Sequence, residues 1–177
     1  MLAYVFWHVP RAEAAPREYE SLHREFREVL ESSAIHGFRG ARMFRLASIP
    51  WLGGRSGYED WYLLDDSAAL DVLDAAAISE ARQRSHDRVA AQAADGTAGL
   101  YGLRLGAQVT PRIAYWLSKP DGMSYAGFES SLAALIADGC CLWGRRMVLG
   151  PTPEFCLHAP APRELPHPAL AIDLDAR

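Results

Sequence analysis

Residues 3–10 read AYVFWHVP, and residues 113–120, far along the chain, read IAYWLSKP. Each stretch is rich in aromatic or β-branched residues and ends at a proline, a pattern typical of a buried strand. Each is followed by an amphipathic helix pattern and then by a second strand pattern, FRGARMF at residues 38–44 and LWGRRMV at residues 142–148. A repeat of this length indicates two copies of one supersecondary unit that bury their apolar faces against each other.

Composition excludes several classes of protein. The 177 residues suffice for one good core or for two small fused half-domains, and 50% hydrophobic with 23% charged residues is the profile of an ordinary globular protein. The net charge of −4 gives no support for a nucleic-acid partner. No stretch is long and apolar enough for a membrane span. Cys140, Cys141 and Cys156 have no disulfide-framework spacing, which predicts a cytoplasmic protein.

Apolar periodicity and capping residues predict the elements of the first unit. The helix at residues 16–34 has an apolar face with Tyr19, Leu22, Phe26 and Leu30. The predicted order is strand 2–9, helix 16–34, strand 38–47, strand 58–64, a helix capped by Asp66 or Ser67, helix 79–94 and strand 97–105. This β-α-β-β-α-α-β order is a ferredoxin-like arrangement with one added helix.

The second unit is predicted to be shorter. Its order is strand 112–118, a helix capped by Ser124, strand 140–149, strand 154–159 and strand 169–174. Residues 160–168 are rich in proline and leave no room for a second helix. We expect the added helix at 79–94 to cover the sheet of the second unit, and the alternative is a bare patch that serves as a homodimer interface. The predicted repeats are residues 1–108 and 109–177, together in one compact domain.

This pattern resembles the dimeric α/β-barrel superfamily of ferredoxin-like folds, which includes antibiotic-biosynthesis monooxygenases, EthD-like proteins and relatives of chlorite dismutase. The duplicated order carries the resemblance, together with residues 59–70, EDWYLLDDSAAL, which are similar to the third strand and second helix of EthD-like members. The resemblance implies an α+β fold in which two fused ferredoxin-like repeats pack their antiparallel sheets into an α/β barrel around a cavity. No proximal-histidine segment of the haem-using members is matched, so no cofactor is predicted.

Strand alternation divides the side chains between the two faces of each sheet. The more aliphatic set, with Ala3 and Val5, is assigned to the helix side, and a mixed aromatic and ionisable set to the barrel interior. In the mixed set the predicted catalytic residues are His8 and His158. The predicted binding residues are Tyr4, Phe6, Arg42, Asp60, Tyr62, Arg104, Tyr115 and Arg146.

Two interpretations of the mixed set stay open, because buried charges must be paired or must line a wet pocket. In the first, an aromatic-walled pocket uses its arginines to hold an acidic or phenolic ligand, and a histidine moves a proton. This predicts a small-molecule-binding protein, and its enzymatic form would be a cofactor-independent monooxygenase-like or isomerase-like enzyme that acts on an aromatic or acidic metabolite. In the second, an Arg–Asp network fills the barrel. A non-enzymatic interaction protein is the alternative function, and a haem protein a third, on fold analogy alone.

The remaining candidates carry weaker signals. His23 is predicted on the polar side of the first helix, exposed to solvent, and His86 lies among arginines on a solvated face. Trp51, in the connection between two strands, is either a lid, a partner anchor or a tip packed against its own sheet. No pair of histidines has metal-ligand spacing, so no metal site is predicted.

Overall fold

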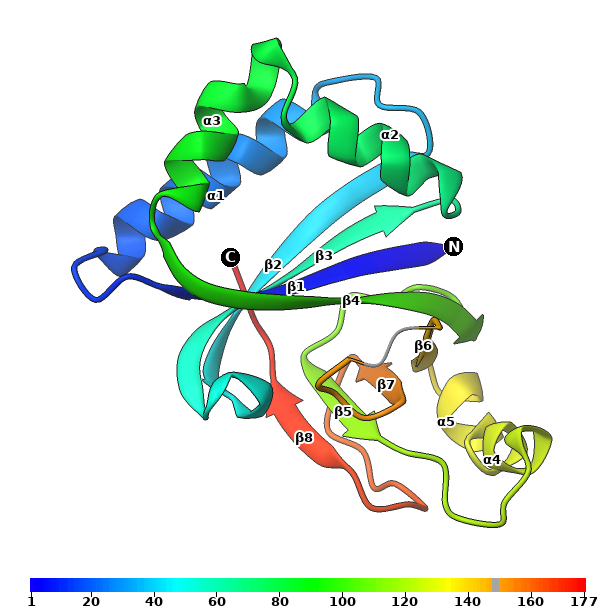
Figure 1. Cartoon of the computed structure of the whole chain (residues 1–177). Helices are drawn as coiled ribbons and strands as arrows, with labels where there is room; N and C mark the ends of the chain where they lie inside the picture. Colours follow the sequence, from blue (N-terminus) through cyan, green and yellow to red (C-terminus); the bar gives the residue numbers. More distant parts are fainter. Residues whose placement is uncertain (148–149) are drawn as a thin grey trace. The chain divides into compact units, whose positions relative to one another are not determined.

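The computed structural model describes residues 1–147 and 150–177, and these divide into two compact units. Unit 1 comprises Met1–Ala98 with Arg177, and unit 2 comprises Gly99–Ala176. The elements that begin in unit 1 are β1 (Leu2–Pro10), α1 (Pro16–Glu31), β2 (Phe38–Ile49), the short 3-10 helix Pro50–Leu52, β3 (Arg55–Leu64), α2 (Ala68–Ala77), α3 (Glu80–Ala90) and β4 (Ala93–Leu105), which continues into unit 2 (Figure 1).

The strands of unit 1 follow the order β4-β1-β3-β2, and β3 is antiparallel to both of its neighbours. This is the strand order of the ferredoxin-like fold, so the predicted arrangement of the first unit is confirmed. The register places Tyr4 opposite Tyr62 and Phe6 opposite Asp60. Helices α1, α2 and α3 lie on the face of the sheet that carries these four side chains (Figure 1).

Local sequence explains where the helices of unit 1 begin. Pro16 occupies the first turn of α1, where a missing N–H costs nothing, and the buried face of α1 carries the predicted apolar residues. At the start of α2, the Asp66 carboxylate accepts a hydrogen bond of 3.1 Å from the backbone N–H of Ala69. Of the two predicted caps, Asp66 therefore makes this contact.

The position of α3 corrects a prediction. The helix packs beside α1, where Arg88 Nη1 donates to Glu25 Oε1 at 2.7 Å and the ring of His86 meets the ring of Phe26 edge-on at 5.9 Å. It therefore covers unit 1, and the expectation that it covers the sheet of the second unit is wrong. The reason is the short connection from α2, because Ile78 and Ser79 alone separate the two helices.

Unit 2 has the same relative strand order as unit 1. Its elements are β5 (Ile113–Leu117), α4 (Tyr125–Ser131), α5 (Ala133–Ala137), β6 (Cys141–Arg145), β7 (Phe155–Ala159), β8 (Leu170–Asp173) and β9 (Asp175–Ala176). The strands follow the order β8-β5-β7-β6, the fourth, first, third and second of the unit, and the second half of β4 pairs with β6. The predicted strand 140–149 ends at Arg145, and its residues 148–149 lie outside the described residues.

The proline-rich segment 160–168 forms no helix, as predicted, but it covers the helix side of the unit 2 sheet. Leu165 packs against the apolar cluster there, and the ring of His167 stacks on the ring of Phe128 at 5.4 Å. The Tyr115 hydroxyl accepts a hydrogen bond of 2.7 Å from the Arg163 N–H and donates one of 3.1 Å to its carbonyl. The predicted bare patch on this face is therefore wrong.

Among the described residues, none of the helices combines the length and the apolar character that crossing a lipid bilayer requires.

Candidate functional site

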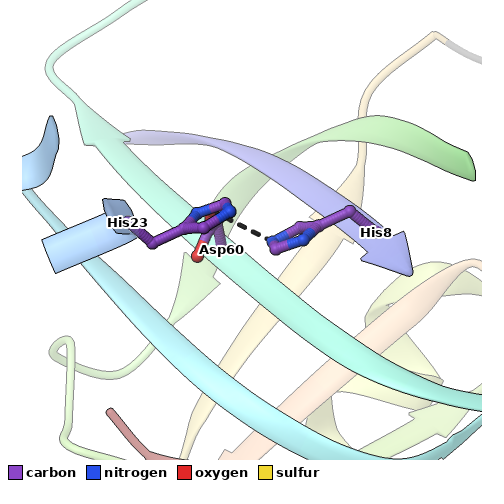
Figure 2. A group of neighbouring side chains, drawn as sticks. All are labelled: His8, His23 and Asp60. Carbon is purple, nitrogen blue, oxygen red and sulfur yellow. Dashed lines mark ion pairs between the residues drawn. The ribbon is translucent and has the colours of Figure 1, made fainter. Parts of the chain in front are cut away.

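Two imidazoles and a carboxylate meet on the helix side of the unit 1 sheet. His8 comes from β1, His23 from α1 and Asp60 from β3 (Figure 2). Asp60 Oδ2 lies 3.3 Å from His8 Nε2 and 3.4 Å from His23 Nδ1. All three side chains are buried. We call these three residues the Asp60 cluster.

Two tyrosines extend the Asp60 cluster. The Tyr19 hydroxyl lies 2.6 Å from His8 Nδ1, and the Tyr62 hydroxyl donates to Asp60 Oδ2 at 3.3 Å. The imidazole rings of His8 and His23 are stacked, with centroids 4.6 Å apart and planes 4° from parallel. Contacts on both its nitrogens therefore hold the His8 ring in place.

Burial and the neighbouring charges set the protonation states of the cluster. Burial by itself raises the pKa of Asp60, but the His8 and His23 imidazoles beside it bring that pKa well below its usual value. Burial lowers the pKa of His23, and Asp60 only partly opposes this shift. Burial, together with the charge of Asp60, raises the pKa values of Tyr19 and Tyr62. Asp60 is therefore ionised beside hydroxyl groups that keep their protons.

A pocket of about 570 Å³ opens onto the Asp60 cluster. Its floor is formed by Tyr4 and Phe6 of β1 with Asp60 and Tyr62 of β3, and His23 closes one side. The helices supply an apolar wall of Phe26 and Leu30 from α1, Leu70, Leu73 and Ala77 from α2, and Val89 and Ala90 from α3. This volume and this mostly apolar wall are typical of sites that bind small organic molecules.

The polar residues of the pocket define which charges it accepts. Asp71 and Asp74 of α2 line the pocket and are exposed. His86 of α3 also lines it and is half-buried. With Asp60 this makes three carboxyl groups, and the described lining residues include no lysine or arginine. The pocket therefore favours an uncharged or cationic ligand over an anionic one.

Five predicted site residues come together here, but on the opposite face from the one expected. Tyr4, Phe6, His8, Asp60 and Tyr62 were assigned to the interior of a barrel, and they face the helices of unit 1 instead. The assignment failed because both faces of this sheet are buried: the whole stretch from Trp7 to Val9 and from Trp61 to Leu64 has little exposure. When both faces are buried, the polarity of the side chains does not indicate which face the helices cover.

The three arginines that were expected to hold a ligand lie elsewhere. Arg42 pairs with Trp61 in the β2–β3 ladder and so lies on the face away from Asp60. Arg104 forms an ion pair with Glu129 in unit 2, with Arg104 Nε 2.7 Å from Glu129 Oε1. Arg146, also in unit 2, is exposed. None of these three lines the unit 1 pocket.

The two other predicted residues belong to the core of unit 2. Tyr115 is part of the apolar cluster on the helix side and bonds to the backbone of Arg163. His158 is buried on the other face of the same sheet, with its ring 6.3 Å from the ring of Trp143. His158 is not among the residues that line the unit 1 pocket, and Tyr115 has a packing role.

Two residues of the site were missed. His23 is buried, so its predicted exposure on the polar side of α1 is wrong, and Tyr19 was treated as a core residue only. The spacing contained the signal: His23 follows Tyr19 by four residues and precedes Leu30 by seven, which places all three on one helix face.

Trp51 lies in the short 3-10 helix Pro50–Leu52 that connects β2 to β3. Its ring packs edge-on against the ring of Trp7, with centroids 5.1 Å apart. The interpretation as a tip that packs against its own sheet is therefore confirmed.

The Asp60 cluster offers nitrogen and oxygen ligands for a metal ion. One ligand atom from each of the three residues lies within 4.8 Å of those of the other two.

The fold defines a class: an α+β protein of ferredoxin-like topology, here with a pocket between the sheet and the helices of unit 1. The chain is similar to a proposed monooxygenase from Fusobacterium nucleatum subsp. nucleatum, with a TM-score of 0.60, 9% identity and coverage of 88% of this chain and 73% of that one. It is also similar to a proposed chlorite dismutase (TM-score 0.50, 15% identity, 98% and 94% coverage) and to an anthrone oxidase-like protein (TM-score 0.50, 10% identity, 98% and 72% coverage). No family model and no curated protein matches the chain. At these identities the likeness shows the fold.

Proposed function

We propose that this protein binds an uncharged, mostly apolar small molecule in the unit 1 pocket and acts on it in a monooxygenase-like or isomerase-like reaction. The observation that carries the proposal is the Asp60 cluster at the buried end of a 570 Å³ pocket with an apolar wall. The apolar surface of such a pocket binds the body of a ligand, and a few polar groups fix the orientation of that ligand.

The polar end suits a ligand that carries an oxygen, such as a hydroxyl or a carbonyl group. His23 Nε2 and Asp60 Oδ1 are buried and have no hydrogen-bond partner in the described structure, and both residues line the pocket. Buried polar atoms in proteins nearly always have a hydrogen-bond partner. These two atoms therefore favour a ligand that places a polar group at this end of the pocket. An acceptor at this end, such as neutral His23, can take a proton from a ligand hydroxyl group or from a neighbouring C–H, which is the step shared by the two proposed reaction types.

The sequence predicted an aromatic or acidic metabolite, and we keep the aromatic one. The acidic alternative rested on arginines in the site, and the pocket has carboxyl groups in their place. An aromatic or aliphatic ligand without a negative charge fits Asp71 and Asp74 near the opening, and Tyr4, Phe6 and Phe26 offer it aromatic surface.

The structure removes one motivation for the alternative function, a non-enzymatic protein that assembles through an uncovered sheet. Residues 160–168 cover the face of unit 2 on which that idea depended. A homodimer through another surface stays a prediction that light scattering across dilutions would test.

The test of the pocket is a binding titration with two aromatic probes of equal ring size, neutral 1-naphthol and anionic 1-naphthoate, in the presence of EDTA. We expect saturable binding of 1-naphthol and binding of 1-naphthoate at least about tenfold weaker, because one like-charge contact is worth about 1.4 kcal/mol or more in a partly buried site. Equal affinities would contradict the charge class of the ligand, and no binding of either probe would contradict the pocket.

A matched pair of substitutions on α2 locates the binding site. Ala77 lines the pocket, whereas Ala75, two residues earlier on the same helix, is exposed and does not. Ala77→Phe should abolish 1-naphthol binding by filling the pocket, and Ala75→Phe should leave it unchanged. Binding that survives Ala77→Phe would place the probe elsewhere.

We further propose that residues 1–108 and 109–177 are copies of one ancestral repeat and that their sheets pack into an α/β barrel. The shared strand order of the two units supports the duplication. Distances between spin labels on β3 and β7 would test the barrel, because it requires the two sheets to face each other.

A further inference from the structure

We propose that the Asp60 cluster is a binding site for a divalent transition-metal ion, held by His8, His23 and Asp60 in unit 1. This inference goes beyond the proposed function, since it concerns an ion and not the organic ligand, and it departs from the sequence-based expectation of no metal site. The donor set is two imidazoles and one carboxylate. Ions such as zinc and ferrous iron are bound by this set with one or more positions left open for a substrate.

The separations between the donor atoms fit such an ion. Ligand atoms bonded to zinc at about 2.0–2.1 Å in a tetrahedral arrangement lie about 3.3–3.4 Å apart. Asp60 Oδ2 lies 3.3 Å from His8 Nε2 and 3.4 Å from His23 Nδ1, which matches two edges of such a tetrahedron. The same side chains are buried, so an ion there would have little competition from bulk water.

A hydrogen bond behind the first imidazole has the form that metal sites use. Metal-bound histidines usually bond their second ring nitrogen to another group, which fixes the ring and its tautomer. The Tyr19 hydroxyl lies 2.6 Å from His8 Nδ1, so it can accept an N–H from that nitrogen and leave Nε2 unprotonated toward Asp60. Tyr19 is therefore a positioning residue for the ion.

The ion binding requires one local movement. The rings of His8 and His23 are stacked with near-parallel planes, and two ligands of one ion must converge on it. His23 turns about its side-chain torsions in this proposal, and it has room to do so because it borders the pocket. The same border leaves the open coordination positions facing the pocket, where the oxygen of a bound ligand would lie.

The experiment uses the full chain, cleared of metal with EDTA and then freed of chelator. Cobalt(II) is titrated in and followed by visible absorption, because its bands report nitrogen and oxygen ligation directly. We expect one Co²⁺ per chain, displaced by one equivalent of Zn²⁺ and not by Mg²⁺, which prefers oxygen ligands. Absence of a one-to-one spectrum in the wild-type chain would overturn the proposal.

Variants separate this site from binding to other histidines. His23→Asn should abolish the cobalt spectrum, and His36→Asn, which removes an exposed histidine outside the cluster, should leave it intact. Tyr19→Phe should weaken binding by about 10- to 100-fold while one ion still binds. Near-UV circular dichroism checks that each variant is folded. If His23→Asn does not fold, Asp60→Asn replaces it as the variant that removes a ligand.

An unchanged spectrum in His23→Asn, or loss of the spectrum in His36→Asn, would show that the ion binds elsewhere and the proposal fails. The 1-naphthol titration in EDTA is independent of these results. Failure of the metal site therefore leaves the proposed function standing, and failure of probe binding leaves the metal site standing.

Discussion

Two adjacent carboxyl side chains of β3 are buried on opposite faces of the same sheet. Asp60 lies among imidazoles and stays ionised, as described above. Glu59 faces the other way and accepts hydrogen bonds from the indole nitrogens of Trp7 at 2.6 Å and of Trp61 at 2.5 Å. Burial raises the pKa of Glu59 to about 7, although the two indoles act in the opposite direction. One carboxyl group therefore lies beside two imidazoles, and the other accepts hydrogen bonds from two neutral indole N–H groups.

Substitution of Glu59 tests its role in holding the two indoles. Glu59→Ala removes an acceptor from two buried N–H donors and leaves a small cavity, so we expect a loss of about 2–4 kcal/mol in the free energy of unfolding. Glu59→Gln keeps an acceptor of similar size and should lose less than half as much. Urea unfolding followed by tryptophan fluorescence measures both values, and equal losses would contradict a hydrogen-bonding role.

At the scale of elements, the joint between α1 and β2 determines how closely α2 approaches the sheet. Gly37 has a φ of +75°, and its carbonyl accepts a hydrogen bond of 2.9 Å from the Asp65 N–H at the end of β3. A β-carbon added at Gly37 would lie 2.5 Å from the Ala69 β-carbon of α2. Glycine is therefore needed here for its backbone conformation and for its lack of a side chain.

Gly53 provides a control for Gly37. Its φ of +72° is nearly the same, but an added β-carbon would meet nothing within 4 Å. Gly53→Ala should lower the free energy of unfolding by about 1–2 kcal/mol, which is the cost of the left-handed backbone conformation for a residue with a β-carbon. Gly37→Ala should lower the free energy of unfolding by about 1–3 kcal/mol more than that, because its β-carbon would overpack against α2. Equal losses in thermal or urea unfolding would contradict the close approach of α2.

At the scale of the whole molecule, both units have the same strand order but cover their sheets differently. Unit 1 uses three helices and keeps a pocket beneath them. Unit 2 uses two short helices together with segment 160–168, and a tightly packed cluster with Phe128 and Leu157 fills the space. The candidate site therefore belongs to the unit with the fuller helical layer.

The cover over unit 2 can be tested by loosening it. Leu165→Ser removes the apolar contact between segment 160–168 and the apolar cluster of unit 2, and it should expose that cluster. We expect the average mass in light scattering to rise with concentration more steeply than that of the wild type, because exposed apolar patches associate. Pro166→Ala, which changes an exposed residue of the same segment, is the control. Identical concentration dependence in both variants would show that the segment is not needed as a cover.

Much of the fold was predictable from the sequence. The helices and strands were placed within a few residues because apolar period, proline and glycine act locally, and the predicted helix 16–34 differs from α1 only at its end. Asp60 was also recognisable, since a carboxyl group inside the apolar run of β3 demands a partner. The partner His23 was missed. Its spacing from Tyr19 and Leu30 places it on the apolar face of α1, but that spacing does not identify Asp60 as the residue it meets.

The α+β elements, their order and the ionisable groups on buried strands follow from short-range spacing, so they could be predicted from the amino-acid sequence. The face of the sheet that those groups use, and the helix side chains that meet them, depend on how the elements pack in three dimensions. Alternation assigns residues to two faces but does not say which face a helix will cover when both are buried. The approach of α1 to β1 and β3, which joins His23 to His8 and Asp60, depends on packing between segments far apart in the chain.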